Sequence, residues 1–324
     1  MKNSFKIFSI IIIFFYSVAI ADANEFKFEA KQLNYLNNSK IIEGIGNIKI
    51  IDKNNTEIYA DKFQYNEKTG ILNLNGNIKF LDKINDLIIN ADELTYYKKL
   101  EKIISDKKVK VLIQDKYTLI SNNIEYLQKI NKISSNTNSI FKDNIGNIFQ
   151  INSYEYFINK KILNGKNIKL IDLNKNTYSI EDAIINLNLN QIKGKKISLT
   201  DVNQNNYSIN NAMIDLNNNK LLGKDVAIKL NKNTFNNSEN DPRMRGNSIA
   251  ADKDKTILTK GVFTTCKLSD KCPPWLLSAD KIEHDKKTKQ INYKNAWLKL
   301  YDVPVLYFPT FFHPDPTVKR QSGF

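Results

Sequence analysis

Apolar and polar residues alternate along much of this chain, a pattern typical of half-buried β-strands. Over positions 72–80 every even-numbered residue is apolar or glycine, and every odd-numbered residue is Asn or Lys. An equivalent face runs over 42–50, thirty residues earlier. Polar segments such as 66–70 and 217–220 separate the runs and have the composition of hairpin turns. The alternation therefore predicts many short antiparallel strands.

The alternating segments recur with a nearly constant period of 29 to 31 residues. Recurrent strand starts align at Lys31, Asp61, Asp92, Asn122, Asn152, Glu181 and Asn210. A period this regular indicates a stacked repeat architecture. Each unit is a hairpin, which cannot bury an apolar face alone, so successive units must stack. We predict an all-β fold, a repeat-built β-jellyroll or open β-slide of stacked antiparallel strands.

Stacking the units about 4.8 Å apart would make two facing sheets with a continuous apolar lining, on the order of 40 Å long. Ten apolar positions on the inward face are candidates for this lining. They are Ile48, Ile50, Ile78, Phe80, Val109, Val111, Ile168, Leu170, Ile197 and Leu199. A closed, dry core between the sheets would show the same alternation. An open lipid-binding groove and a closed core therefore both remain possible.

The N-terminus has the three regions of a secretory signal peptide. Lys2 and Lys6 precede or flank an apolar run over 7–20, and small residues follow it. The run has about 14 apolar residues, fewer than the roughly 20 that a spanning helix needs, which disfavours a membrane anchor. We predict that residues 1–23 are a signal peptide, cleaved near Ala21 or Ala23, and that the mature chain is exported.

Composition is ordinary for a folded protein, with 41% hydrophobic and 25% charged residues among 324. The formal net charge of +14 suits an anionic partner. An exported protein seldom meets nucleic acid and the lysines are scattered, so a phosphorylated glycolipid is the better candidate. A solvated lysine-rich surface produced by codon bias is the alternative.

No motif for catalysis or cofactor binding stands out. The two histidines, His284 and His313, lie in unrelated contexts, and no nucleophile elbow, phosphate-binding glycine loop or zinc-protease helix is present. Cys266 and Cys272 are the only cysteines. Export favours their oxidation to a local disulfide, and the alternative is that both thiols stay unpaired. With only the remote His284 as a further ligand, they are weak candidates for zinc ligands. We expect neither an enzyme nor a metal site.

The last thirty residues, 295–324, place Pro304, Pro309, Pro314 and Pro316 among aromatic residues. Each proline removes a ladder donor, so this segment is not an ordinary central strand. It has the character of a junction to another structure.

The C-terminal part contains a series of short motifs: Asp-Pro-Arg at 241–243, Gly-Val-Phe-Thr-Thr-Cys at 261–266, Cys-Pro-Pro-Trp at 272–275, His-Asp at 284–285, Asn-Ala at 295–296, Val-Pro-Val at 303–305, Arg320, and Ser-Gly-Phe at 322–324. Together they resemble the outer-membrane lipopolysaccharide-assembly family called LptD. The resemblance covers about a quarter of the chain. It implies an exported OstA-like jellyroll that receives lipopolysaccharide from a periplasmic bridge protein of the LptA type.

The resemblance also implies roles for both ends of the chain. The N-terminal edge, residues 26–36, would dock the bridge protein by strand addition, and a frayed edge is the alternative. Pro304, Pro309, Pro314 and Arg320 would mark the junction to a transmembrane barrel, near a seam through which lipid passes. We expect that barrel to be missing from this sequence, as a fragment or a truncation, and the lipoprotein LptE to be a partner only if a barrel is present. Family cysteines pair with cysteines of the barrel.

These observations divide the chain into a signal peptide (1–23), a lipopolysaccharide-binding jellyroll (24–300) with a polar insertion near 231–247, and a proline-rich junction (301–324). The predicted function is lipopolysaccharide transport and assembly at the periplasmic face of the outer membrane; the chain without a barrel would be periplasmic. A free-standing periplasmic bridge protein is the alternative, and a β-solenoid glycan-active enzyme or adhesin is an alternative of another class. No nucleic-acid partner is expected.

Overall fold

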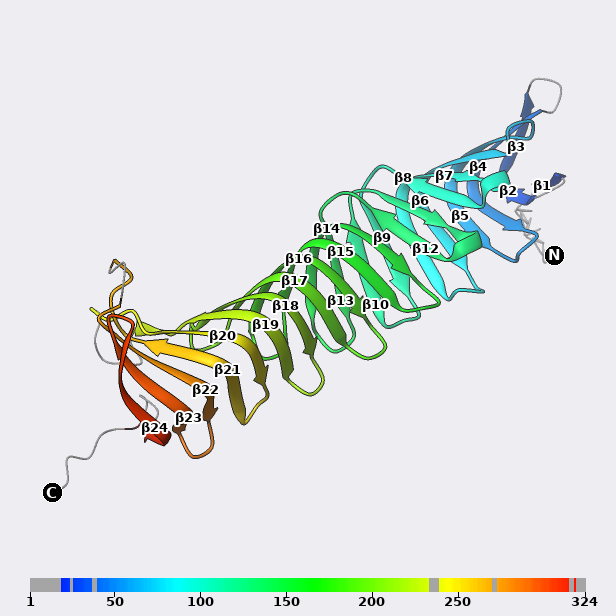
Figure 1. Ribbon diagram of the computed structural model, residues 1–324. Coiled ribbons are helices and arrows are strands. Elements are labelled where there is room, and N and C mark those ends of the chain that lie inside the picture. Colours follow the sequence, from blue (N-terminus) through cyan, green and yellow to red (C-terminus); the bar gives the residue numbers. More distant parts are fainter. Residues whose placement is uncertain are drawn as a thin grey trace, which may run out of the picture.

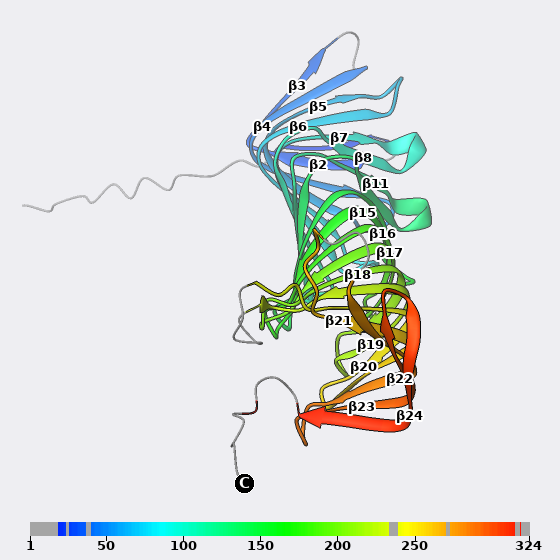
Figure 2. The same ribbon diagram turned by 60° about the vertical axis from the view of Figure 1, so that its left-hand side comes forward.

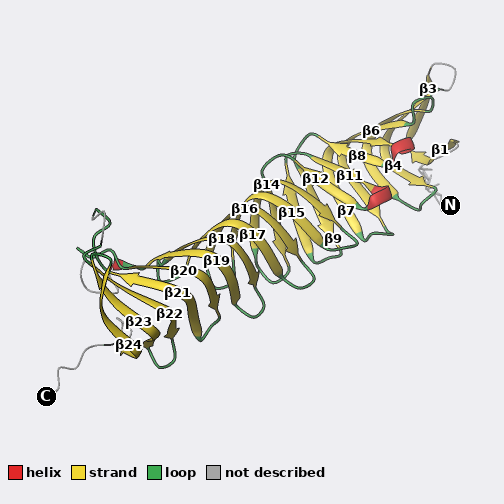
Figure 3. Ribbon diagram, viewed as in Figure 1, coloured by secondary structure: helices red, strands yellow, loops and turns green. Residues whose placement is uncertain are grey.

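The computed structural model describes residues 19–23, 26–36, 40–232, 239–269, 273–314 and 318. Its strands form one continuous antiparallel sheet of 24 strands in the described part of the chain. Consecutive strands lie side by side and build an elongated body, with β1 and β24 near opposite ends (Figures 1 and 3). A second view shows that the stack curves along its length (Figure 2), as the intrinsic twist of strands requires. The all-β prediction of stacked antiparallel strands is confirmed.

Most strands are long, and the strands in the middle of the chain are short. The bounds are β1 Ala19–Ala23, β2 Phe26–Ala30, β3 Gln32–Leu36, β4 Ile41–Asp52, β5 Glu57–Asn66, β6 Ile71–Asp82, β7 Leu87–Tyr97, β8 Lys102–Ser105, β9 Val109–Ile113, β10 Tyr117–Ser121, β11 Ile124–Leu127, β12 Lys132–Ser135, β13 Ser139–Asp143, β14 Ile148–Phe157, β15 Ile162–Ile171, β16 Thr177–Asn186, β17 Gln191–Thr200, β18 Asn206–Asp215, β19 Lys220–Lys229, β20 Arg243–Ala251, β21 Lys255–Thr264, β22 Trp275–Asp285, β23 Gln290–Leu300 and β24 Val303–Pro314. Two 3₁₀ turns, η1 Lys98–Leu100 and η2 Gln128–Ile130, lie between them.

Each long strand bends at its middle, so that it has two arms. In β15 the inward residues are Leu163 and Gly165 before the bend and Ile168 and Leu170 after it, and two exposed residues lie between. We call the arm that contains Ile162–Lys166, with its neighbours across the sheet, arm 1. Arm 2 contains Ile168–Ile171 and its neighbours. The two facing sheets expected from the sequence are thus two arms of one bent sheet.

In every second long strand the bend contains a residue in the left-handed conformation. Asn77, Asn167 and Asn295 have φ of 45°, 49° and 50°, and each lies where the pairing with the next strand is interrupted. Asparagine tolerates this conformation better than most residues. In β15 the bend shifts the alternation of buried residues by one position, whereas in β6, which bends at Gly76 and Asn77, the buried residues stay at even-numbered positions. In both strands the apolar faces of the two arms point at each other.

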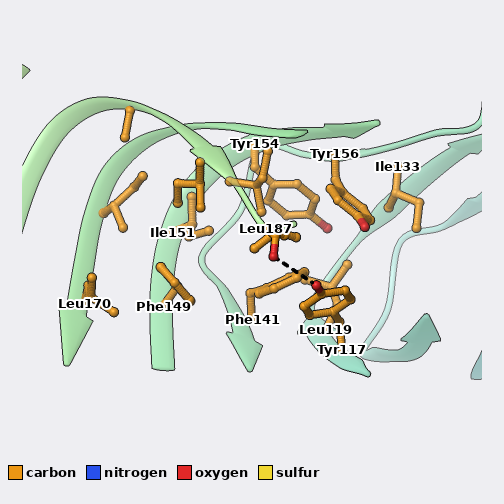
Figure 4. Close-up of a cluster of buried hydrophobic side chains, with 14 of the residues drawn as sticks. Tyr117, Leu119, Ile133, Phe141, Phe149, Ile151, Tyr154, Tyr156, Leu170 and Leu187 are labelled. Carbon is orange, nitrogen blue, oxygen red and sulfur yellow. Dashed lines mark hydrogen bonds between the residues drawn. The ribbon is translucent and has the colours of Figure 1, made fainter. Parts of the chain in front are cut away.

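The hydrophobic core lies between the arms and runs the length of the body. Phe28 of arm 2 stacks on Phe63 of arm 1, with ring centroids 4.7 Å apart. Farther along, Phe141 of arm 2 packs against Tyr156 of arm 1 at 5.9 Å, within the cluster drawn in Figure 4. All buried core side chains of the described residues belong to one cluster, except Leu276. The core is continuous because every unit contributes to the same interior.

The N-terminal edge differs in detail from the expected docking strand over 26–36. β2 pairs with β1 on one side and with β4 on the other, so arm 2 ends at β1. β3 pairs only with β4 among the described strands and is the free edge of arm 1. The predicted cleavage near Ala21 or Ala23 falls within β1, and cleavage there would leave β2 as the edge. Residues 1–18 of the predicted signal peptide lie outside the described residues.

The proline-rich segment forms the last described strand of the same sheet. β24 pairs along its length with β23, and Pro304 and Pro314 lie opposite Lys299 and Gln290. No other described strand pairs with β24, and an edge strand tolerates proline because one side needs no donors. The segment 301–314 therefore continues the sheet, whereas Arg320 lies outside the described residues. The predicted polar insertion is the connection between β19 and β20, shorter than 231–247 because β20 begins at Arg243.

Candidate functional site

All ten candidate lining residues lie inside, between the two arms. Their side chains are at most 8% exposed, and each belongs to the single hydrophobic cluster. In this conformation the arms are in contact, so a bound chain would need them to separate. The structure brings the ten residues together along one interior, and it places none of them in an open groove.

Each arm has a free rim, formed by the turns at the strand ends farthest from the bend, and the two rims face each other across what we call the mouth. Near the N-terminal end a buried ion pair joins the two rims. Lys98, in η1 at the rim of arm 1, approaches Asp52 at the rim of arm 2, with Nζ 2.9 Å from Oδ2. The side chains are 8% and 0% exposed. The Tyr96 hydroxyl also donates to Asp52 Oδ2 at 3.1 Å. Burial, followed by the charge of Asp52, raises the pKa of Tyr96 well above its usual value.

A second clasp follows one unit later. The Tyr126 hydroxyl, from arm 1, donates to Asp82 Oδ2 of arm 2 at 2.6 Å. Asn85 reaches back from the rim of arm 2 to the Tyr126 hydroxyl at 3.1 Å. Burial and then Asp82 raise the pKa of Tyr126 well above its usual value, so the hydroxyl remains a donor. We call the groups around Asp52 and Asp82 the rim clasps.

Farther along, the aspartates at the rim of arm 2 accept hydrogen bonds from tyrosines of the same arm. Tyr178 donates to Asp172 at 3.0 Å and Tyr207 to Asp201 at 3.1 Å, and each pair lies within arm 2. Bonds between the rims in this part of the body include one from the Tyr117 hydroxyl to the Leu187 carbonyl at 3.3 Å, drawn in Figure 4, and one from the Asn174 amide of arm 2 to Asn219 Oδ1 of arm 1 at 2.6 Å. The buried ion pair between the rims lies at the N-terminal end, together with more of the described side-chain hydrogen bonds across the mouth.

Both rims carry aliphatic side chains that water reaches. They are Ile84, Ile145, Leu173 and Val202 on arm 2, and Leu100, Ile130 and Leu189 on arm 1, all 43% to 75% exposed. Each lies in a turn between strands. These side chains were not predicted from the sequence because the turns were identified by their polar residues alone. The pattern that could have revealed them is an aliphatic residue one or two positions after an aspartate in a turn, as in Asp82-Lys83-Ile84 and Asp172-Leu173.

In the middle of the body the bend is replaced by a break. β8, β11 and β12 form arm 1 there, while β9, β10 and β13 form arm 2. Hydroxyl groups gather at the break: Ser121 Oγ lies 3.1 Å from Ser135 Oγ and 2.8 Å from Ser139 Oγ. The Tyr154 hydroxyl is buried near Ser139. The interior is therefore apolar along its length but polar at this one corner.

The remaining candidate residues do not gather. Cys266 is a free thiol among the described residues, with Sγ 3.5 Å from the Trp275 carbonyl. Cys272 lies outside the described residues, so the local disulfide stays a prediction. His313 Nε2 lies 3.0 Å from the Tyr293 hydroxyl. Within the described ranges, no group of three or more His, Cys, Asp or Glu could hold a metal ion. No helix in those ranges is long and apolar enough to cross a membrane.

Comparison with known proteins points to one family over part of the chain. No family model matches the sequence. The chain is 43% identical over 68 residues to the LPS-assembly protein LptD of Shewanella frigidimarina, and 41% identical over 68 residues to that of Shewanella denitrificans. Each match covers 21% of this chain and 8% of the relative, so the chain spans a small part of these relatives. Over that segment the chain is LptD-like.

Proposed function

We propose that this protein carries lipopolysaccharide in the apolar interior between its two arms and passes it toward the outer leaflet of the outer membrane. The observation that carries the proposal is the single cluster of buried hydrophobic side chains that extends without interruption from β2 to β23. The partial similarity to LptD supports the same substrate. The sugars and phosphates would remain in water at the mouth.

The proposal follows from the cost of moving acyl chains through water. At about 0.8 kcal/mol for each CH₂ exposed, a chain of about 14 carbons costs roughly 10 kcal/mol, and a lipid A molecule has several chains. An apolar path of matching length removes most of this barrier. The aliphatic residues of the rims, such as Leu100 and Leu173, would shorten the passage of a chain from water to the interior.

Loading requires the arms to part, and the rim clasps oppose this at one end. The described contacts across the mouth are fewer toward the C-terminal half, where the Asn174 amide bonds Asn219 across the mouth but Asp172 and Asp201 bind tyrosines of their own arm. We infer that the arms open more readily in that half. A bridge protein of the LptA type would add a strand at the N-terminal edge, where β3 and, after cleavage, β2 offer unpaired backbone groups.

The test is photocrosslinking of the purified protein to lipopolysaccharide. Photoreactive residues replace Ile78, Val111 or Ile197 of the interior, and Asn75 or Lys79 of the outer face serve as controls. The proposal predicts adducts at the interior positions and few at the outer ones. Equal adducts on both faces, or none, would instead favour a closed structural core and refute the transport function.

A further inference from the structure

A groove lies on the outer face of arm 1, opposite to the apolar interior. It has a volume of about 1330 Å³ and runs from β8 to β20. Its floor is thin because inward positions in five successive strands are glycine or alanine, in direct register. They are Gly165, Ala183, Gly194, Ala212 and Gly223. The groove uses none of the ten interior candidates.

One side of the groove is a row of lysines. Lys166, Lys195 and Lys224 occupy equivalent positions on every second strand, which places them roughly 10 Å apart along the body. All three are exposed, and Asp182 of β16 lies opposite both Lys166 and Lys195. The carboxylates at the other end of the groove are paired, Glu155 with Lys132 at 2.7 Å and Glu125 with Lys102 at 2.5 Å. Four lysines line the groove, Lys193 among them, against the two remaining carboxylates, Asp106 and Asp182, so the charge outside the two ion pairs is positive.

An apolar row runs parallel to the lysines, two residues away along each strand. Ile184, Met213 and Leu222 project outward from β16, β18 and β19, and Lys193 stands between the first two. Ile184 is 52% exposed and Leu222 is 49% exposed, although both lie in strands. The spacing along a strand puts the two rows about 7 Å apart. The surface is thus amphipathic, with a basic and an apolar strip side by side.

We propose that this outer groove binds a single-chain anionic amphiphile, with its alkyl chain along Ile184, Met213 and Leu222 and its acidic head at the lysine row. The apolar strip is one side chain wide, which fits one alkyl chain and not the several chains of a large glycolipid. The lysines supply the complementary charge for a carboxylate or a phosphate. A fatty acid and a lysophospholipid share this chemistry. This site is independent of the interior that the transport function uses.

The experiment measures binding of palmitate, lysophosphatidate and lysophosphatidylcholine to the purified protein by titration calorimetry. The two anionic amphiphiles should bind, and the zwitterionic one should bind at least about tenfold more weakly. Replacing Lys166, Lys195 and Lys224 together by Gln should weaken anionic binding by about tenfold. The matched control replaces the exposed turn lysines Lys53, Lys129 and Lys175 by Gln, which removes the same charge and should leave affinity unchanged. The tighter binder of palmitate and lysophosphatidate identifies the preferred head group, carboxylate or phosphate.

The position of the chain is read with a photoreactive fatty acid. Adducts should map to β16, β18 and β19 on the outer face, and Leu222→Asn should abolish them while the protein stays folded. Adducts at Ile197 or Ile168 would place the chain in the interior and overturn the proposal. An equal loss of affinity in the Lys166, Lys195 and Lys224 variant and in its control variant would also overturn the proposal. The same holds if an acidic peptide binds as well as palmitate and its binding is unaffected by Leu222→Asn. If the outer groove binds no amphiphile, the prediction that lipopolysaccharide crosslinks to the interior positions is unaffected.

Discussion

The Lys98–Asp52 clasp makes a sharp prediction about stability. Lys98→Met keeps the length of the side chain and removes its charge, leaving Asp52 with no cation at its Oδ2. The Asp52 side chain is 0% exposed, so an unpaired carboxylate would be stranded between the rims. Removing one partner of a buried pair costs about 3–5 kcal/mol. We expect Lys98→Met to lower the free energy of unfolding by an amount in this range.

The assay is urea denaturation followed by far-UV circular dichroism, with hydrogen exchange of β4 and β7 as a local readout. The matched control is Lys83→Met: Lys83 Nζ lies 2.6 Å from Glu57, but the lysine side chain is 56% exposed. Such a surface pair is worth at most about 1 kcal/mol. The double variant Lys98→Met with Asp52→Asn should recover part of the loss, because the stranded charge is gone. A Lys98→Met protein no less stable than Lys83→Met would refute the reasoning.

Three further predictions follow from packing, burial and redox state. Gly223→Ala should destabilise the folded protein by about 1–3 kcal/mol in thermal unfolding, because the new Cβ would lie 2.7 Å from Ile209 Cγ2. Gly246→Ala is the control and should destabilise it less, because the nearest atom to its Cβ would lie at 3.3 Å. A larger loss for Gly246→Ala than for Gly223→Ala would contradict the packing described. Burial raises the pKa of Tyr96, Tyr126 and Tyr178 above the unfolded value of about 10, so their contribution to stability is complete below that pH and falls as pH rises above it. In a pH titration, the tyrosinate absorbance of the folded protein should therefore appear at higher pH than that of the unfolded chain. Titration curves that coincide would show that these hydroxyls are not buried. Cys266 and Cys272 should form a local disulfide in oxidised protein, detected as a crosslinked peptide by mass spectrometry, and two freely alkylated thiols would exclude it.

The repeat and its alternation predicted the architecture because they are local signals. Leu72, Leu74, Ile78 and Phe80 were assigned to one face and are all buried in the interior. The same reasoning placed the apolar residues of 72–80 on one face and predicted no bend, whereas the chain bends at Gly76 and Asn77, which both have positive φ. This bend leaves the buried residues at even-numbered positions on both sides, so the alternation in the sequence does not reveal it. The two facing sheets and the single bent sheet therefore look alike in the sequence.

Contacts between the rims could not be read from the sequence. Asp52 and Lys98 are 46 residues apart, and no local pattern distinguishes Lys98 from the adjacent exposed Lys99. Likewise, Asp52 and Asp172 both begin polar turns, yet one spans the mouth and the other binds Tyr178 of its own arm. The twist of the sheet decides which rims meet. That geometry accumulates over many strands and leaves no trace in a single unit.

The central claim is that acyl chains enter between the arms when the rims part. The most direct measurement bridges Asp52→Cys and Lys98→Cys with a short bismaleimide, in a protein whose Cys266 and Cys272 are replaced by Ser, and repeats lipopolysaccharide photocrosslinking from Ile78. The account predicts that adducts at Ile78 form in the unbridged protein and disappear once the rims are joined, while crosslinking at Lys79 does not change. Adducts at Ile78 that persist at the same yield in the bridged protein would contradict it.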